Sequence, residues 1–159
     1  MAVRNILKFG DERLSKIAKP VTQFDDDLKS LLDDMRETMR VSNGVGLAGP
    51  QIGVLRRVVV IEIDDLYLEL INPEIVSSKG EQYEDEGCLS VPKYYDKVKR
   101  PKVVTVKAFD RDGKEFTVTG KKLLARCRCH EIDHLNGILF IDKSENGQKF
   151  KERRWKFCF

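Results

Sequence analysis

The segment CRCHEIDHLNG, residues 127–137, contains both histidines of this 159-residue chain. It ends a stretch over residues 121–135 with helical periodicity, and the Asn-Gly pair that follows suits a helix C-terminus. On a helix, His130 and His134 lie one turn apart, so their imidazoles can hold one metal ion between them. Glu131 follows about 100° around the helix, where its carboxylate can take a proton from water at the ion.

Two cysteines precede the histidines, but neither has the geometry of a third ligand. The ion would lie level with the middle of the His-to-His turn, and Cys127 is about 7.5 Å away along the axis, too far for its short side chain. Cys129 projects about 100° to 140° away from the histidines. We therefore expect Cys127 to be a small inward-facing residue and Cys129 to lie on the outer face of the helix.

The third ligand is predicted to be Cys88. Cys158 is next to last in the chain, where ends usually fray, and a carboxylate is the remaining alternative. Cys88 belongs to EGCLSVP, in which Gly87 allows close approach of the backbone and Pro92 stiffens the exit. One thiolate, two imidazoles and a water make the three-ligand set of a catalytic site, whereas structural zinc sites use four protein ligands.

Helices are predicted near the two ends of the chain and strands between them. Apolar residues at a spacing of three and four predict a helix from Asp25 to Met39, and Asp11 can cap a short helix through Ala18. Four strands are expected, over residues 57–63, 67–72, 103–109 and 114–120. The short connections between them favour antiparallel pairing, so the expected class is α+β.

Length and composition predict one domain over residues 1–159, with a basic helix or tail at about 144–159. A net charge of +3 gives no reason to expect direct reading of nucleic acid. With neither a signal-peptide pattern nor a long apolar run, we expect a soluble cytoplasmic protein without disulfides or membrane contact. The basic run KFKERRWK, residues 149–156, suits either a solvated last helix or a docking patch for an acidic partner.

A glycine-rich segment, SNGVGLAGPQIGV, surrounds the polar residue Gln51 at residues 42–54. It lacks the Gly-Lys-Ser/Thr of a phosphate loop, and a surface turn is an equal interpretation of it alone. Taken together, G-V-G-L-A-G-P-Q, E-G-C-L-S and H-E-I-D-H-L-N-G resemble the three motifs of the peptide deformylases. The opening ILKFGDERLSKIAKPV and the stretch from Val98 through FIDK resemble that family too, so the likeness covers about residues 4–143.

The resemblance implies antiparallel sheets around a central helix that carries the HEIDH motif. It also implies metal-dependent hydrolysis of the N-formyl group of formylmethionyl nascent peptides, with release of formate. The ligands of that family correspond to Cys88, His130 and His134, in agreement with the geometric argument. The ion in such enzymes is typically Fe²⁺, with Zn²⁺, Ni²⁺ or Co²⁺ able to substitute, and thiolate with imidazole suits both iron and zinc. The basic tail is a candidate contact with the ribosome.

The same resemblance implies roles for residues around the ion. Glu131 would carry a proton from water to the leaving amine. The Gln51 side chain and the Leu89 backbone N–H would stabilise the oxyanion. The peptide would lie extended against Gly44, Val45 and Gly46 as an added strand.

A pocket for the methionine side chain is implied near Val45, Leu123, Cys127 and His134. For Leu123, packing in the core is an equal expectation. Arg100 is expected either to position the substrate or to form a surface ion pair with Glu86.

Three residues depart from the family pattern. Cys129 replaces a glutamine and removes an amide near the site, which predicts lower activity or greater sensitivity to oxidation with ligation intact. Gly49 replaces an alanine, and Gly10 replaces a proline. Two rival interpretations remain: a zinc peptidase completed by Glu145 or Glu152, and a non-catalytic relative that binds formylated peptides.

Overall fold

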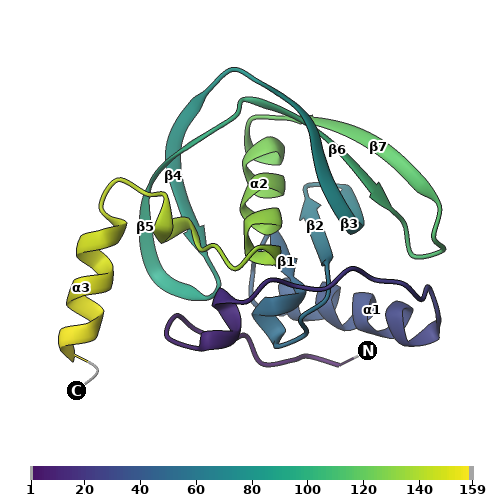
Figure 1. The fold of residues 1–159 in the computed structure, drawn as a ribbon, viewed down its shortest axis with the longest axis horizontal. Helices are drawn as coiled ribbons and strands as arrows, with labels where there is room; N and C mark the ends of the chain where they lie inside the picture. Colours follow the sequence, from purple (N-terminus) through teal and green to yellow (C-terminus); the bar gives the residue numbers. More distant parts are fainter. Residues whose placement is uncertain (1, 158–159) are drawn as a thin grey trace.

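Two antiparallel sheets enclose a central helix in the computed structural model, which describes residues 2–157 (Figure 1). The larger sheet has the strand order β1-β2-β3-β6-β7, formed by Gly46–Ala48, Val58–Ile63, Leu66–Lys79, Val103–Phe109 and Glu115–Lys121. The smaller sheet pairs β4 (Gln82–Cys88) with β5 (Val91–Arg100). The predicted α+β class with antiparallel sheets around a central helix is confirmed.

The central helix is α2, Leu123–Leu135, which begins two residues later than predicted. It stands between β4 and β5 on one side and the larger sheet on the other (Figure 1). All residues from 125 to 132 are consequently buried. The expectation that Cys129 faces outward is wrong: it is 5% exposed and belongs to the core between α2 and the larger sheet, because this part of the helix has no outer face.

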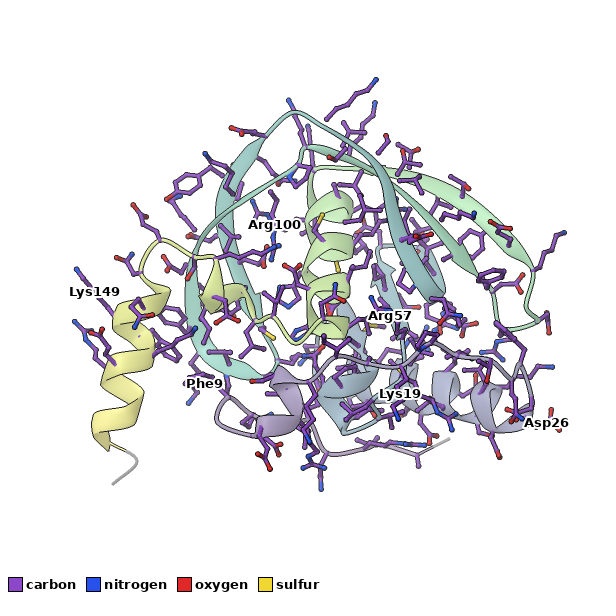
Figure 2. The ribbon with its side chains drawn as sticks, in the orientation of Figure 1. Phe9, Lys19, Asp26, Arg57, Arg100 and Lys149 are labelled. Carbon is purple, nitrogen blue, oxygen red and sulfur yellow. The ribbon has the colours of Figure 1, made fainter. Side chains whose placement is uncertain are left out.

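Arg57, the residue before β2, binds the C-terminal end of α2. Arg57 donates hydrogen bonds to the Leu135 carbonyl oxygen at 3.0 Å and to Asn136 Oδ1 at 3.1 Å. Figure 2 shows Arg57 beside this end of the helix. A guanidinium at the negative end of a helix dipole is favourable, so Arg57 stabilises the element that carries the histidines.

Helix α1, Asp26–Val41, covers the other face of β1 and β2. Asp25, predicted as the first residue of this helix, is its N-cap and accepts a hydrogen bond from the Leu28 N–H at 3.0 Å. The apolar stripe of the helix is buried as the spacing predicted. The short helix predicted after Asp11 is only the 3₁₀ turn η1, Glu12–Ser15, although Asp11 does cap it.

The strands predicted in the sequence are present, and both predicted hairpins pair antiparallel. Strand β3 runs seven residues beyond the predicted end at Asn72, pairing first with β2 and then with β6. Asn72 has a φ of 51° and its side chain bonds both the N–H and the carbonyl of Val21. The register shift at this point accommodates Pro73, which cannot donate a ladder hydrogen bond, and β3 changes its partner here from β2 to β6.

Strands β1, β4 and β5 were not predicted. In β4 and β5 the inward side chains include Glu86, Asp96 and Arg100, so the usual alternation of apolar and polar residues is missing. The glycine-rich segment is no surface turn, because residues 46–51, in β1 and the 3₁₀ helix η2 (Gly49–Ile52), are buried.

The chain ends in the short helix η3, Phe140–Asp142, followed by α3, Gly147–Phe157. Within the predicted basic tail, Gly147–Phe157 is helical and residues 144–146 form a bend and a turn before it. Cys88, Cys127 and Cys129 are free thiols, and Cys158 lies outside the described residues. None of the helices within residues 2–157 has both the length and the apolar character needed to cross a bilayer.

Candidate metal centre

The three side chains predicted as ligands converge at one place. Cys88 is the last residue of β4, and His130 and His134 lie one turn apart on α2. Their ligand atoms all lie within 4.8 Å of one another. His134 Nε2 is 3.2 Å from His130 Nε2 and 3.3 Å from the Cys88 sulfur. Cys127 and Cys129 are not members of this group, in agreement with the helix geometry.

These separations fit a bound metal ion. A tetrahedral ion of the zinc type holds two nitrogens roughly 3.3 Å apart and a nitrogen and a sulfur roughly 3.6 Å apart. The observed 3.2 Å and 3.3 Å are close to these values. Burial lowers the pKa of His134 well below its ordinary value, which favours the neutral imidazole that binds metals. Three protein donors leave a coordination position for water or substrate.

His130 is oriented by a buried carboxylate. Its Nδ1–H donates to Glu86 at 2.7 Å, which directs Nε2 toward Cys88 and His134. Burial by itself raises the pKa of Glu86, but hydrogen bonds from His130 and Arg100 outweigh it and hold that pKa well below its ordinary value. Glu86 therefore stays ionised and keeps the ring in one tautomer.

Two arginines neutralise this carboxylate. Arg100 donates to Glu86 at 2.7 and 3.1 Å and to Asp133 at 2.6 Å, and Arg126 donates to Glu86 at 2.9 Å. Arg100 is 3% exposed, so the predicted pairing with Glu86 exists but is not a surface pair (Figure 2). Glu86 lines the pocket described below, whereas Arg100 does not.

Glu131 lies beside the ligands with an unused oxygen. Its Oε1 is buried, has no hydrogen-bond partner among the described residues, and lies 4.0 Å from His134 Nε2. Burial raises the pKa of Glu131 to about 7. A carboxyl with this pKa and a free oxygen can exchange a proton with a reacting group near neutral pH.

Gln51 presents its amide nitrogen to the same place. The Ala48 N–H donates to Gln51 Oε1 at 3.0 Å, which fixes the orientation of the amide. Gln51 Nε2 donates to Ser90 Oγ at 3.1 Å and lies 3.6 Å from the Cys88 sulfur. Gln51 is 1% exposed, so its amide is a buried donor next to the ligands.

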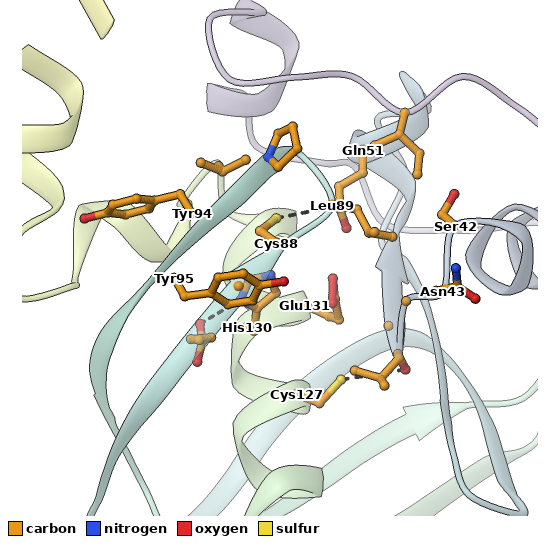
Figure 3. A pocket seen from close by; sticks show the side chains of 18 of the residues that line it. Ser42, Asn43, Gln51, Cys88, Leu89, Tyr94, Tyr95, Cys127, His130 and Glu131 are labelled. Carbon is orange, nitrogen blue, oxygen red and sulfur yellow. Dashed lines mark hydrogen bonds and ion pairs between the residues drawn. The ribbon is translucent and has the colours of Figure 1, made fainter. Parts of the chain in front are cut away.

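A pocket of about 500 Å³ opens onto these groups (Figure 3). Predicted site residues line it as follows: Gly44, Val45, Gly46, Gln51, Cys88, Leu89, Leu123, Cys127, His130 and Glu131. Leu123 is 51% exposed at its edge, so it does not pack in the core. His134, implied as part of the methionine pocket, is fully buried and lies outside the lining.

Gly46 keeps the floor of this pocket open. A Cβ on Gly46 would lie 2.7 Å from Glu131 Oε2 and 2.9 Å from the Cys127 sulfur. Any side chain at this position would therefore occupy the space next to the carboxylate.

The sequence interpretation missed the roles of Glu86 toward His130 and of Ser90 toward Gln51. A signal for Glu86 was present, because residues two apart in a strand share a face and Glu86 precedes Cys88 by two. For Ser90 we find no comparable signal. Glu145 and Glu152, the rival third ligands, are exposed and are not members of the ligand group.

Comparisons with known proteins agree on one family. The family described as polypeptide deformylase matches residues 3–150. The chain is 58% identical over 144 residues to a peptide deformylase of Thermoanaerobacter pseudethanolicus, covering 91% of each chain. It is 59% identical over 143 residues to one of Acetivibrio thermocellus, covering 90% of this chain and 84% of the relative.

Solved structures give the same result. The crystal structure of a peptide deformylase from Legionella pneumophila has a TM-score of 0.91 and 53% identity, covering 98% of this chain and 94% of that one. The structure of a peptide deformylase from Synechococcus elongatus in complex with actinonin has a TM-score of 0.90 and 39% identity, with 98% and 86% covered.

Proposed function

Because this chain belongs to the polypeptide deformylase family, we propose that Cys88, His130 and His134 hold its catalytic metal ion. The chain is a metal-dependent hydrolase that removes the N-formyl group from formylated nascent peptides. The ligand proposal rests chiefly on one observation: the three ligand atoms lie within 4.8 Å of one another, beside the unpartnered oxygen of Glu131.

We propose Fe²⁺ as the native ion, with Zn²⁺, Ni²⁺ and Co²⁺ as substitutes accepted by the same thiolate and imidazole donors. Lewis acidity that makes water nucleophilic near neutral pH is the chemistry such an ion supplies when bound. Metal analysis of anaerobically purified protein, followed by reconstitution with each ion and a measurement of formate release, tests the choice. A higher activity with any ion other than Fe²⁺ would argue against it.

Glu131 is proposed to move the proton. It accepts the proton of the attacking water on its free Oε1 and delivers it to the amine nitrogen as the bond from nitrogen to the formyl carbon breaks. Its pKa of about 7 suits both acceptance and donation at neutral pH. Formate and a free N-terminal amine are the products.

Gln51 and Leu89 are proposed to stabilise the oxyanion that forms at the formyl carbon. The Ala48 N–H fixes the Gln51 amide with its Nε2 beside the Cys88 sulfur. Leu89 directly follows Cys88 in the chain. Donors held rigidly before the charge develops need no reorganisation, and the loss of one typically costs about 10² to 10³ in rate.

The substrate is proposed to lie along β1. This strand is at the edge of the larger sheet, paired only with β2 among the sheet strands, so its other edge can accept an extended peptide. Gly44, Val45 and Gly46 would pair with the peptide backbone. The methionine side chain would enter the pocket between Leu123 and Cys127.

Two substitutions test the assignment of roles. Cys88→Ala is expected to lose the metal and the release of formate from formyl-Met-Ala-Ser, whereas Glu131→Gln is expected to keep the metal and lose activity. Cys129→Ala is the matched control that should retain the metal. Stoichiometric metal in the Cys88→Ala protein would refute the ligand set. Absence of formate with every reconstituted ion would instead identify a protein that only binds formylated peptides.

We further propose that the enzyme works in the cytoplasm and that α3 contacts the ribosome. Lys149 and Arg153 are on this helix, together with Lys151, which pairs with Asp142. Cosedimentation with ribosomes at two salt concentrations tests the contact, since phosphate contacts weaken with salt. Lys149→Glu with Arg153→Glu should abolish it, and unchanged cosedimentation would contradict it.

A further inference from the structure

The two proposed oxyanion donors, Gln51 and Leu89, come from separate parts of the chain, and Ser90 connects them. Gln51 belongs to η2, whereas Leu89 lies in the turn between β4 and β5. Ser90 directly follows Leu89, and its hydroxyl oxygen accepts a hydrogen bond from Gln51 Nε2 at 3.1 Å. Ser90 is 0% exposed and is not among the residues that line the pocket. It can therefore act on the reaction only through its neighbours.

The amide nitrogen of Gln51 carries two hydrogens, and Ser90 takes one of them. The same nitrogen lies 3.6 Å from the Cys88 sulfur, so the other hydrogen is available on the side of the ligands (Figure 3). The Ala48 N–H binds Oε1 and determines which end of the amide is the oxygen. The last torsion of a glutamine side chain is soft, so a single bond leaves the amide free to rotate. The bond to Ser90 fixes this rotation.

The backbones of Gln51 and Ser90 are held together by the N-terminal segment. The Leu7 N–H donates to the Gln51 carbonyl at 2.7 Å, and the Phe9 N–H donates to the Ser90 carbonyl at 2.8 Å. Two residues of one extended segment thus bind both partners. With the backbones fixed in this way, the Ser90 hydroxyl is the group that joins the Gln51 side chain to the turn that contains Leu89.

We propose that Ser90 is a positioning residue whose hydroxyl holds the Gln51 amide in the rotation at which Gln51 and the Leu89 N–H can bind the same oxyanion. This inference rests on the proposed oxyanion role of Gln51 and Leu89. Donors are effective when they need no reorganisation as the charge develops, and a displacement of about 1 Å can cost about 10² in rate. Loss of the hydroxyl should slow the chemical step and leave the binding of metal and substrate unchanged.

A double-mutant cycle with formyl-Met-Ala-Ser as the substrate tests the proposal. Ser90→Ala removes one oxygen atom and is expected to lower kcat about tenfold, with KM and metal content within about twofold of the unmodified enzyme. Gln51→Ala is expected to lower kcat by about 10² to 10³. Adding Ser90→Ala to Gln51→Ala should change kcat by about twofold or less, because no amide remains to be positioned.

Thr38→Val is the matched control for the loss of a buried hydroxyl. Thr38 is 0% exposed, and its hydroxyl accepts from the Arg4 N–H at 2.9 Å and donates to the Asp34 carbonyl at 2.7 Å. It lies on α1 and does not line the pocket. This variant should lower the thermal stability and leave kcat unchanged. Thermal unfolding and metal content are measured for every variant.

The outcomes separate this inference from the proposed function. If Ser90→Ala lowers kcat by the same factor with and without the Gln51 side chain, Ser90 has only a structural role, and the inference is overturned while the proposed function stands. An unchanged kcat in Ser90→Ala, or an effect confined to KM or metal content, also overturns it. If Gln51→Ala keeps full activity, the proposed oxyanion role of Gln51 fails and the inference fails with it.

Discussion

The Glu86 carboxylate accepts a hydrogen bond from His130 Nδ1 at 2.7 Å while two buried arginines bind the same carboxylate. One side chain therefore has two tasks: it orients His130, a proposed metal ligand, and it neutralises charge on Arg100 and Arg126. Its removal should affect both the metal site and the stability of the fold.

Glu86→Ala is predicted to lower metal affinity by about 10- to 100-fold, because the partner that orients His130 is lost. It should also lower the free energy of unfolding by about 3–5 kcal/mol, since two buried guanidiniums lose a charged partner. Competition with a chelator and denaturant unfolding measure the two effects. Glu84→Gln, at an exposed position of the same strand, is the control. Equal metal affinity of the Glu86→Ala and unmodified proteins would show that His130 is positioned by its helix alone.

Gly46→Ala is predicted to reduce kcat/KM by about 10² or more. The added methyl group would push the Glu131 carboxylate out of position by up to about 1 Å. The Cβ would lie 2.7 Å from Glu131 Oε2. Metal content and thermal unfolding serve as controls and should show that the variant is folded and loaded. Normal activity in such a protein would mean that Glu131 can shift without consequence, which is incompatible with its proposed role.

Thiol reactivity should follow burial. Burial raises the pKa of the Cys127 thiol and of the Cys129 thiol, and both residues are 5% exposed. In metal-free protein, Cys88 should therefore react with iodoacetamide at least about tenfold faster than either, and bound metal should protect it. Peptide mass spectrometry after timed labelling locates the modified residues, and denatured protein gives the reference rates. Rapid labelling of Cys129 would contradict this prediction and would support the expectation that this residue makes the enzyme sensitive to oxidation.

The sequence predicted the parts of this protein whose signals are local. The helix periodicity, the caps and the spacing of His130 and His134 all act within a few residues, and each appears in the structure. Cys88 required an argument by elimination, because a ligand from another element leaves no spacing to measure.

The errors arose where the tertiary environment decides. Cys129 was placed on the outer face because of its helical angle, and a surface ion pair was one of the two expectations for Arg100 because charged side chains are mostly exposed. Arg100 is buried because the inward face of β5 packs against α2, and Cys129 is buried in the core that α2 forms with the larger sheet. Strands β4 and β5 were missed because their inward face carries charged side chains. These charges are stable in the interior because Glu86 pairs with Arg100 of β5 and with Arg126 of α2.

Lys122→Gly is predicted to stabilise the protein by about 1 kcal/mol. Lys122 precedes α2 with φ 54° and ψ −117°, a conformation that costs a residue with a Cβ about 1–3 kcal/mol and glycine very little. Glycine's greater freedom in the unfolded chain offsets part of this gain, by about 0.5–1 kcal/mol. Denaturant unfolding of metal-free protein measures the difference. Lys121→Gly, at the regular end of β7, is the matched control and should destabilise the protein by about 0.5–1 kcal/mol. If both glycine variants lose stability to the same extent, the backbone before α2 is not strained.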